Sequence, residues 1–233
     1  MNEVLVSTVG GLLAFVFWGM SDWLVSKNSK KYNAYEVNLA TKIAGLVTSI
    51  LLLAFNYQNI ESFSQLIPFI AVGLLFAVAF VLMIKALTDG SVGVIVPVIS
   101  TNPLFTLALA IILGGSVLSG NQIMSILVII SGVLALTYQK NTSKIPLKEL
   151  HKDTIYALLA AAIWGLAFYI VNQNVADVPW QIVYGTVGLS SFIFSLLLVF
   201  IKLRKTFRSV VVKTGANKIG LRTNLDCSSN LLF

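Results

Sequence analysis

Long hydrophobic runs separated by short polar segments make up most of the sequence. Seven runs are long enough to cross a bilayer as α-helices, because a membrane-spanning helix takes about 20 apolar residues. Hydrophobicity within each run is continuous, whereas the strands of a membrane β-barrel alternate apolar and polar positions. The pattern therefore predicts helical spans at Val4–Val25, Glu36–Phe55, Leu66–Leu87, Val92–Leu113, Gln122–Tyr138, Thr154–Asn172 and Trp180–Ile201.

The amino-acid composition indicates the same class of protein. Hydrophobic residues make up 57% of the 233 residues and charged residues 11%, with a mean hydropathy of +0.89. Ordinary soluble domains are about 45–50% apolar and about 25% charged. We therefore expect an all-α polytopic membrane protein whose surroundings are the lipid bilayer.

The chain offers few of the residues that enzymes and metal sites need. Cys227 is the only cysteine and His151 the only histidine, which excludes a disulfide framework and a cluster of Cys and His metal ligands. A membrane-embedded hydrolase or transferase would need paired acids or a Ser/His arrangement, and only Asp22 and Glu36 lie near the spans, both at their ends. A retinal-binding photoreceptor would need a lysine in the last span, which has none. We expect no enzymatic activity, no cofactor and no metal.

Positive charge is concentrated in the odd-numbered loops. The net charge of +7 could suggest nucleic acid, but no polar domain carries a basic face, so we expect lipid headgroups rather than nucleic acid as its partner. By the positive-inside rule the odd loops lie in the cytoplasm and the N-terminus lies outside. The basic residues are Lys27, Lys30 and Lys31 after the first span, Lys140, Lys144, Lys148 and Lys152 after the fifth, and Lys202, Arg204, Lys205 and Arg208 after the seventh.

The sequence matches itself at an offset of 146 residues. The match superimposes Trp18-Gly19 on Trp164-Gly165 and, further on, Ser49 on Ser195. Since an odd number of spans separates the two copies, the second copy enters the membrane from the opposite face. Such inverted repeats are typical of secondary transporters, whose substrate site lies near the membrane midplane between the two halves.

Several local motifs agree with one known family. They are Phe17-Trp18-Gly19-Met20-Ser21-Asp22, Lys85-Ala86-Leu87, the segment 90–99 (GSVGVIVPVI), Pro103-Leu104-Phe105-Thr106, Gly132-Val133-Leu134 and Ala162-Ile163-Trp164-Gly165. Over residues 1 to about 201 the chain resembles EamA-type transporters of the drug/metabolite transporter superfamily, which have two five-helix repeats. The resemblance implies a carrier in the cell membrane that moves a small metabolite or drug by alternating access.

The chain departs from that family pattern in three respects. Gly114-Gly115-Ser116 stand where an acidic residue often follows the fourth span, and the loop charges oppose the cytoplasmic termini common in the family. The third departure is a basic segment, 202–233, at the position where the repeat predicts another helix. Four central charges, Lys213, Lys218, Arg222 and Asp226, each disfavour insertion by about 2.5–3.5 kcal/mol.

We therefore expect a first repeat at residues 1–139, a Lys-rich linker at 140–153, the first two helices of a second repeat at 154–201, and a tail outside the bilayer at 202–233. The chain then looks truncated or frame-shifted. A monomer would lack part of the cavity wall and would not transport, whereas a homodimer could complete the cavity.

Charged residues inside the spans are the first candidates for the substrate pathway. Lys42 lies about 9 Å inside the second span by the helical rise, and Asp22 and Lys85 lie toward the same face of the membrane. These three residues could form a charged gate or contact the charge of a substrate. The alternative is that both lysines extend to the interface on their aliphatic stems.

Prolines and aromatic residues supply the remaining candidates. Pro97 and Pro103 each remove a helical hydrogen bond, and Asn102 precedes the second, so the fourth span could bend beside a cavity or form a packed kink. Trp18 and Trp164 lie well inside their predicted spans. Each could line a cavity at the membrane midplane or pack over the glycine that follows it. Tyr169 and Tyr184 add hydrogen-bonding groups near one end of the last two spans.

The sequence thus favours a transporter of small molecules and leaves one serious alternative. A non-transporting fragment or membrane scaffold, derived from a truncated or frame-shifted transporter gene, would have the same first repeat. The residues do not indicate the substrate, since amino acids, sugars, purines and drugs all suit an aromatic and neutral-polar lining.

Overall fold

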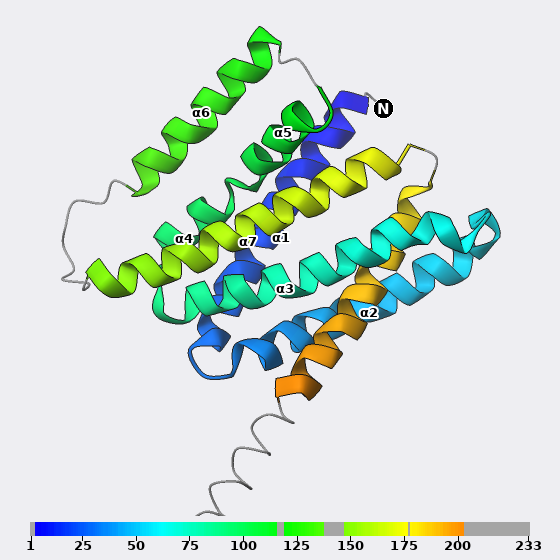
Figure 1. Ribbon diagram of the computed structural model, residues 1–233, viewed down its shortest axis with the longest axis horizontal. Coiled ribbons are helices and arrows are strands. Elements are labelled where there is room, and N and C mark those ends of the chain that lie inside the picture. The colour runs from blue at the N-terminus through cyan, green and yellow to red at the C-terminus, as the bar shows by residue number, and fades with distance from the viewer. Residues whose placement is uncertain (1–2, 116–118, 138–146, 177, 203–233) are drawn as a thin grey trace, which may run out of the picture. The chain divides into compact units, whose positions relative to one another are not determined.

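The computed structural model describes residues 3–115, 119–137, 147–176 and 178–202, and within these ranges it is helical with no β-strand (Figure 1). Two short 3-10 helices, η1 (Tyr57–Asn59) and η2 (Phe63–Leu66), join the second and third helices. The α-helices are α1 (Glu3–Ser29), α2 (Ala34–Asn56), α3 (Ile67–Asp89), α4 (Val92–Ile99), α5 (Asn102–Ile112), α6 (Gly120–Thr137), α7 (Leu147–Asn174) and a last helix, Trp180–Lys202.

Five helical segments in the described part of the chain are long and apolar enough to cross a membrane. Their bounds are Thr8–Ser29, Phe63–Asp89, Val92–Ile112, Lys152–Asn174 and Trp180–Lys202. The two parts of α2, Ala34–Ile43 and Gly45–Asn59, meet at a 40° bend and make a sixth span if they are counted together. The all-helical, multi-span fold is therefore confirmed. The expected span at Gln122–Tyr138 coincides with α6, but its crossing, and with it the count of seven, stays a prediction.

The fourth span is a broken helix, with α4 ending at Ile99 and α5 beginning at Asn102. Pro97 lies inside α4 and Pro103 in the first turn of α5. Because Pro103 has no N–H, it cannot bond the carbonyl of Ile99 four residues earlier. The side-chain amide of Asn102 donates to that carbonyl instead, at 3.2 Å. The break is therefore stabilised locally, by the residue next to the proline that causes it.

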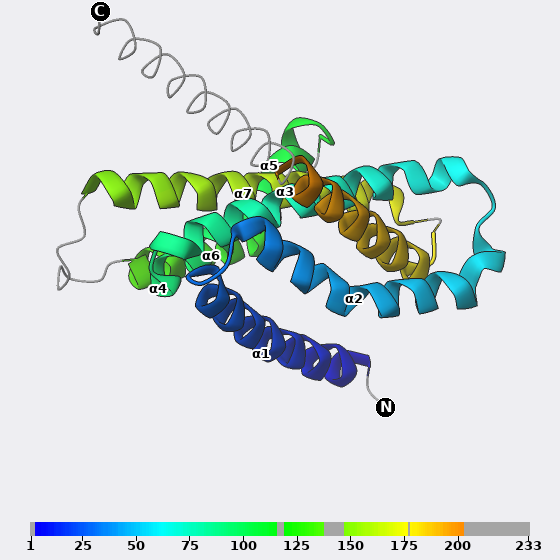
Figure 2. The ribbon, with the colours of Figure 1, turned by 90° about the horizontal axis from the view of Figure 1, so that it is seen from below.

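The centre of the helix packing is α3, which contacts α7 and α2 (Figures 1 and 2). Small side chains on α3, among them Ala77, Ala79 and Ala86, are fully buried and allow close approach. By contrast α1 contributes little to the core, and Figure 2 shows it at the margin of the helices. Its apolar side chains, such as Phe15 and Trp18, are largely exposed, as suits a helix that contacts lipid.

Internal contacts divide the chain into two compact units, Met1–Ser195 and Leu196–Phe233. All of the contacts below lie within the first unit. The described part of the second unit is the last part of the Trp180–Lys202 helix. Most of the tail predicted at 202–233, and most of the linker predicted at 140–153, lie outside the described residues, and the predicted domain boundaries stay predictions.

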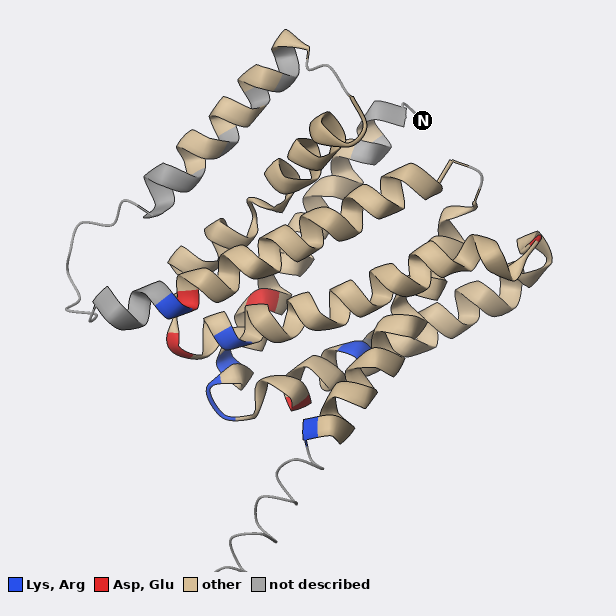
Figure 3. Ribbon diagram, in the orientation of Figure 1, with Lys and Arg blue, Asp and Glu red and all other residues tan. Residues whose placement is uncertain are grey.

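Most charged residues in the described part of the first unit lie toward one end of the helices, whereas Lys42 lies part-way along α2 and Glu61 lies between η1 and η2 (Figure 3). This end contains the last turn of α1, the start of α2, the end of α3 and the start of α7. The arrangement is what an up-and-down bundle produces when its charged loops are the odd-numbered ones.

Candidate functional site

Lys42 lies inside the helix bundle, near the bend of α2. A capping box fixes the start of this helix: Asn33 Oδ1 accepts from the backbone N–H of Tyr35 at 3.1 Å, and Glu36 Oε2 accepts from the backbone N–H of Asn33 at 3.3 Å. Lys42 follows Ala34 by eight residues, which places it about 12 Å along the helix. A lysine at the centre of a span disfavours insertion by about 2.5–3.5 kcal/mol, so its surroundings must compensate.

Aromatic rings supply part of that compensation. The Lys42 Nζ lies 3.5 Å from the ring centroid of Phe80 and 6.0 Å from that of Phe76, both on α3. A desolvated cation–π contact of this kind contributes about 2 kcal/mol. Among the described residues no carboxylate forms an ion pair with Lys42, Asp22 included. The lysine is therefore held by aromatic side chains rather than by a carboxylate.

The rings beside Lys42 belong to a larger group, the aromatic cluster, made of Phe76 and Phe80 on α3 and Trp164 and Phe168 on α7. Edge-to-face contacts join them: the ring centroids of Phe80 and Trp164 are 5.1 Å apart, those of Phe76 and Phe168 5.7 Å, and those of Phe76 and Trp164 6.4 Å. The Trp164 side chain is 8% exposed, and its Nε1–H has no hydrogen-bond acceptor in the described structure. A buried N–H without an acceptor is a costly feature.

Asn38 lies one helical turn before Lys42 and is fully buried. Its Nδ2 donates to Ser195 Oγ at 2.9 Å and to the carbonyl of Ala77 at 3.4 Å, whereas its Oδ1 accepts no hydrogen bond in the described structure. Asn38 thus joins α2 to α3 and to the last helix. Ser195 in turn donates to the carbonyl of Ser191 on its own helix at 2.7 Å.

A second close contact joins α2 to the Trp180–Lys202 helix, through glycines. A Cβ on Gly185 would lie 2.7 Å from Leu53 Cγ and 3.1 Å from the carbonyl oxygen of Ser49, and one on Gly188 would collide with the Ser49 side chain. Ser49 is 1% exposed. Asn38 contacts Ser195, and Ser49, further along α2, contacts Gly185. Residue numbers thus rise along α2 and fall along the other helix. The two helices are antiparallel over this stretch.

The break in the fourth span packs directly on α7. A Cβ on Gly165 would collide with Phe105 and lie 3.0 Å from both the Asn102 carbonyl oxygen and the Thr106 nitrogen. The hydroxyl of Thr106 donates to the carbonyl of Gly165 at 3.0 Å. The predicted residues Pro103, Asn102 and Trp164 are thereby brought to one region, where α5 begins against the glycine that follows the buried tryptophan.

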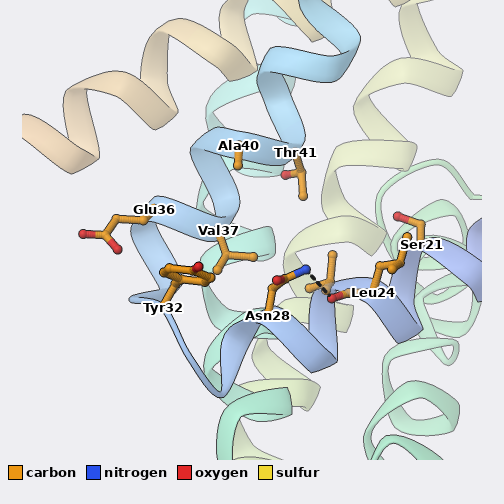
Figure 4. A pocket seen from close by; sticks show the side chains of 9 residues that line it. Ser21, Leu24, Asn28, Tyr32, Glu36, Val37, Ala40 and Thr41 are labelled. Carbon is orange, nitrogen blue, oxygen red and sulfur yellow. Dashed lines mark hydrogen bonds between the residues drawn. The ribbon is translucent and has the colours of Figure 1, made fainter.

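A groove of about 570 Å³ lies between α1 and α2 (Figure 4). The amide of Asn28 donates to the carbonyl of Leu24 at 2.9 Å along one wall. The groove lies toward the charged end of the helices, and neither Lys42 nor Asp22 lines it. Its lining residues are Ser21, Leu24, Val25 and Asn28 of α1, Tyr32 of the turn, and Glu36, Val37, Ala40 and Thr41 of α2.

The remaining predicted residues differ in their burial and in their contacts. Trp18 is 72% exposed on α1, in contrast to Trp164, although the repeat equates the two. Asp22 is half-buried on α1, and Tyr184 is exposed. The Lys85 Nζ lies 5.3 Å from the ring centroid of Tyr35 and 5.8 Å from that of Tyr156.

Tyr169 is half-buried on α7 and Pro97 half-buried inside α4. Neither has a role assigned by these contacts. The structure thus brings Lys42 and Trp164 together around Phe76 and Phe80, and places Asn102 and Pro103 beside Gly165.

Asn38, Phe76 and Phe80 were missed by the sequence reasoning. A signal existed for each: Asn38 is a polar residue four positions before Lys42, and Phe76 and Phe80 are four residues apart, hence on one face of their helix. In the described ranges no group of three His, Cys, Asp or Glu residues is placed to hold a metal ion.

Comparison with known proteins identifies the family. A model of the EamA-like transporter family matches residues 6–138, which is more than half of the chain. A protein of Methanocaldococcus jannaschii, described as uncharacterized, is 28% identical over 129 residues, which are 54% of this chain and 93% of the relative. No solved structure matches the chain. The chain therefore belongs to the EamA-like transporter family, in the drug/metabolite transporter superfamily, and is a multi-pass membrane protein of transporter type.

Proposed function

We propose that this protein is a carrier in the cell membrane that moves a small metabolite or drug by alternating access. Membership of the family does not by itself specify the transport mechanism, the membrane in which the protein resides or the site that binds the substrate. The proposal assigns the Lys42 site, meaning Lys42 with the aromatic cluster, to the substrate pathway. The carrier would form no covalent bond with its substrate and would need no cofactor.

The observation that carries the proposal is the contact between α2 and the Trp180–Lys202 helix. If the two halves are inverted repeats, these helices are equivalent under the offset of 146 residues. A twofold axis between them then requires antiparallel helices that contact each other symmetrically about equivalent points. The point midway between Asn38 and Ser49 falls between Ile43 and Ala44, and the offset maps it to the point between Leu189 and Ser190.

The contacts agree with this requirement. Ser195 meets Asn38 and Gly185 meets Ser49, and the midpoint of Ser195 and Gly185 is Ser190. With the Gly188–Ser49 contact in place of Gly185–Ser49 the midpoint falls between Ser191 and Phe192, so spatial contacts and sequence offset give the same centre to within two residues. Because the contacts played no part in finding the offset, this agreement supports an inverted repeat.

The same centre supports the assignment of the site. Lys42 lies next to the midpoint on α2, its two ring partners Phe76 and Phe80 lie on α3, and the α7 residue Trp164 packs against those rings. In inverted-repeat carriers the substrate lies between the two halves, which rock against each other to expose it to one side and then to the other. Glycines and hydroxyls at the crossing let the two backbones approach each other closely.

Counterflow in proteoliposomes tests the proposal. The purified full chain is reconstituted, and uptake of labelled phenylalanine, glucose, adenine and ethidium is measured with and without the same unlabelled compound inside. A carrier gives saturable uptake that is faster when substrate is present on the other side, since loaded sites return as substrate exchanges. Empty liposomes and a protein-free detergent control give the background. A scaffold or fragment would give uptake at that background for every compound, which would contradict the proposal.

A further inference from the structure

Lys42 carries an ionisable amine at membrane depth, with ring faces beside it and no carboxylate partner in the described part of the chain. A ring face attracts an ammonium group through its quadrupole, but it carries no net charge and accepts no proton. Ionisable groups inside a membrane bundle usually pair with a group of opposite charge or mark a pathway for a charged ligand. Because Lys42 has no carboxylate partner in the described part of the chain, a pathway for a charged ligand is the option that remains.

A second hydrogen-bond donor lies next to the same rings. Trp164 contacts Phe80 and Phe76, the two rings that lie beside Lys42, and its Nε1–H has no acceptor among the described residues. Both an ammonium and an indole N–H can only donate. The Lys42 site therefore presents donors and positive charge within aromatic walls, and what it lacks is an acceptor with negative charge.

We propose that the Lys42 site binds the carboxylate of a small organic acid with an aromatic or apolar body. This inference rests on the proposed transport function and names its substrate class. The carboxylate accepts from the Lys42 ammonium and the Trp164 indole, while the body of the acid packs on Phe76 and Phe80. An amine of the same shape is repelled by Lys42, and a neutral amide forgoes the charge interaction.

Lys85 resembles Lys42 in being half-buried near two rings, but at longer distances, 5.3 and 5.8 Å, whereas Lys27 differs in its exposure. Lys27 lies 5.3 Å from the Trp23 ring centroid but is exposed in the last turn of α1, where water compensates its charge. Lys42 has the shortest of the lysine-to-ring distances, and it is half-buried in the middle part of its helix. Lys27 therefore serves as a matched control, since it offers the same type of contact outside the site.

The test is equilibrium binding of tritiated 3-phenylpropionate to the purified full chain in nanodiscs of neutral phosphatidylcholine. Unlabelled 3-phenylpropionate, 3-phenylpropionamide and 3-phenylpropylammonium compete as an anionic, a neutral and a cationic ligand of similar shape. We expect saturable binding that the acid displaces at concentrations at least about tenfold lower than the amide or the amine. Chloride-containing and chloride-free buffers are compared, to exclude occupation by the inorganic anion.

Variants then assign the effect to the two donors. Lys42→Met is expected to weaken binding about thirtyfold or more, Lys42→Arg to retain most of it, and Lys27→Met to leave it unchanged. Trp164→Phe keeps a ring but removes the N–H, and is expected to weaken binding about tenfold. It provides an independent test if Lys42→Met does not fold, as judged by gel filtration and helical circular dichroism.

Two results would overturn the inference: equal displacement by acid and amide, or binding by a folded Lys42→Met protein that equals the parent. These are distinct from failure of the proposed function. Saturable binding of the acid without counterflow would leave the site assignment intact and remove the carrier. Counterflow of a neutral compound with no preference for acids would support the carrier function and contradict the carboxylate site.

Discussion

Asn38 and Ser195, 157 residues apart in the sequence, share a hydrogen bond of 2.9 Å in the buried contact between α2 and the Trp180–Lys202 helix. Asn38 Nδ2 is the donor, and the second hydrogen bond that this nitrogen makes among the described residues, to the carbonyl of Ala77, is longer at 3.4 Å. The pair therefore fixes how these two helices lie against each other.

Replacement of Ser195 by alanine is expected to lower stability by about 0.6–2 kcal/mol, because hydrogen bonds between membrane helices contribute this much and Asn38 Nδ2 would keep only its longer bond. The measurement is the free energy of unfolding in mixed micelles of increasing SDS fraction. Ser100→Ala is the control, since the Ser100 hydroxyl is exposed and bonds within its own helix, to Val96. Equal losses for the two variants would show that the interhelical bond contributes nothing.

The two glycines that follow Trp18 and Trp164 are expected to differ sharply in their tolerance of alanine. Gly165→Ala places a methyl group against the backbone of Asn102 and Thr106 and should cost about 1–3 kcal/mol. Gly19→Ala meets nothing within 4 Å and should be neutral or slightly stabilising. Thermal unfolding in detergent, followed by helical circular dichroism, compares them. A similar shift for both would indicate that α5 does not approach α7 as closely as described.

The contact between Lys42 and Phe80 is expected to appear as a coupling free energy of about 1–2 kcal/mol. The experiment is a double-mutant cycle with Lys42→Met, Phe80→Leu and the double variant, read out as the free energy of unfolding. The exposed pair Lys27 and Trp23 provides the control cycle, with an expected coupling below about 1 kcal/mol. A coupling near zero for Lys42 and Phe80 would mean that the ring does not hold the ammonium.

Orientation follows from the lysines at the charged end of the helices. In a Cys227→Ser background, a cysteine at Lys30, between α1 and α2, should resist an impermeant maleimide in intact cells and react after lysis. A cysteine at Gln58, between α2 and α3, should react in intact cells. The same experiment at 141–143 tests the linker. The reverse pattern would show that the chain adopts the opposite orientation, with both ends of the first repeat exchanged.

The hydrophobicity and the length of the runs were enough to predict most of the helices, since each long apolar run must satisfy its own backbone hydrogen bonds in lipid. The break in the fourth span was foreseeable for the same local reason, because Pro103 removes a specific bond. The depth of Lys42 followed from counting residues along one helix.

The partners of Lys42 could not be predicted in this way. Spacing within α2 says nothing about which rings of α3 will face Lys42, and in the described part of the chain Asp22 forms no ion pair with it. The equivalence of Trp18 and Trp164 was misleading for a related reason. Identical residues in two repeats share a local structure, but their burial depends on neighbours that the two helices do not share: α7 packs on α3 and α5, whereas α1 lies at the margin.

The offset of 146 residues pairs Lys42 with Gly188, the glycine that lies against Ser49. On the proposed repeat, Lys42 thus has no charged counterpart in the second half. If two identical halves exchanged their conformations, the inward-open and outward-open forms would be equal in energy. A single ammonium on one half removes that degeneracy, so the membrane voltage acts differently on the two forms. The empty protein would then rest with its binding site open to one preferred side.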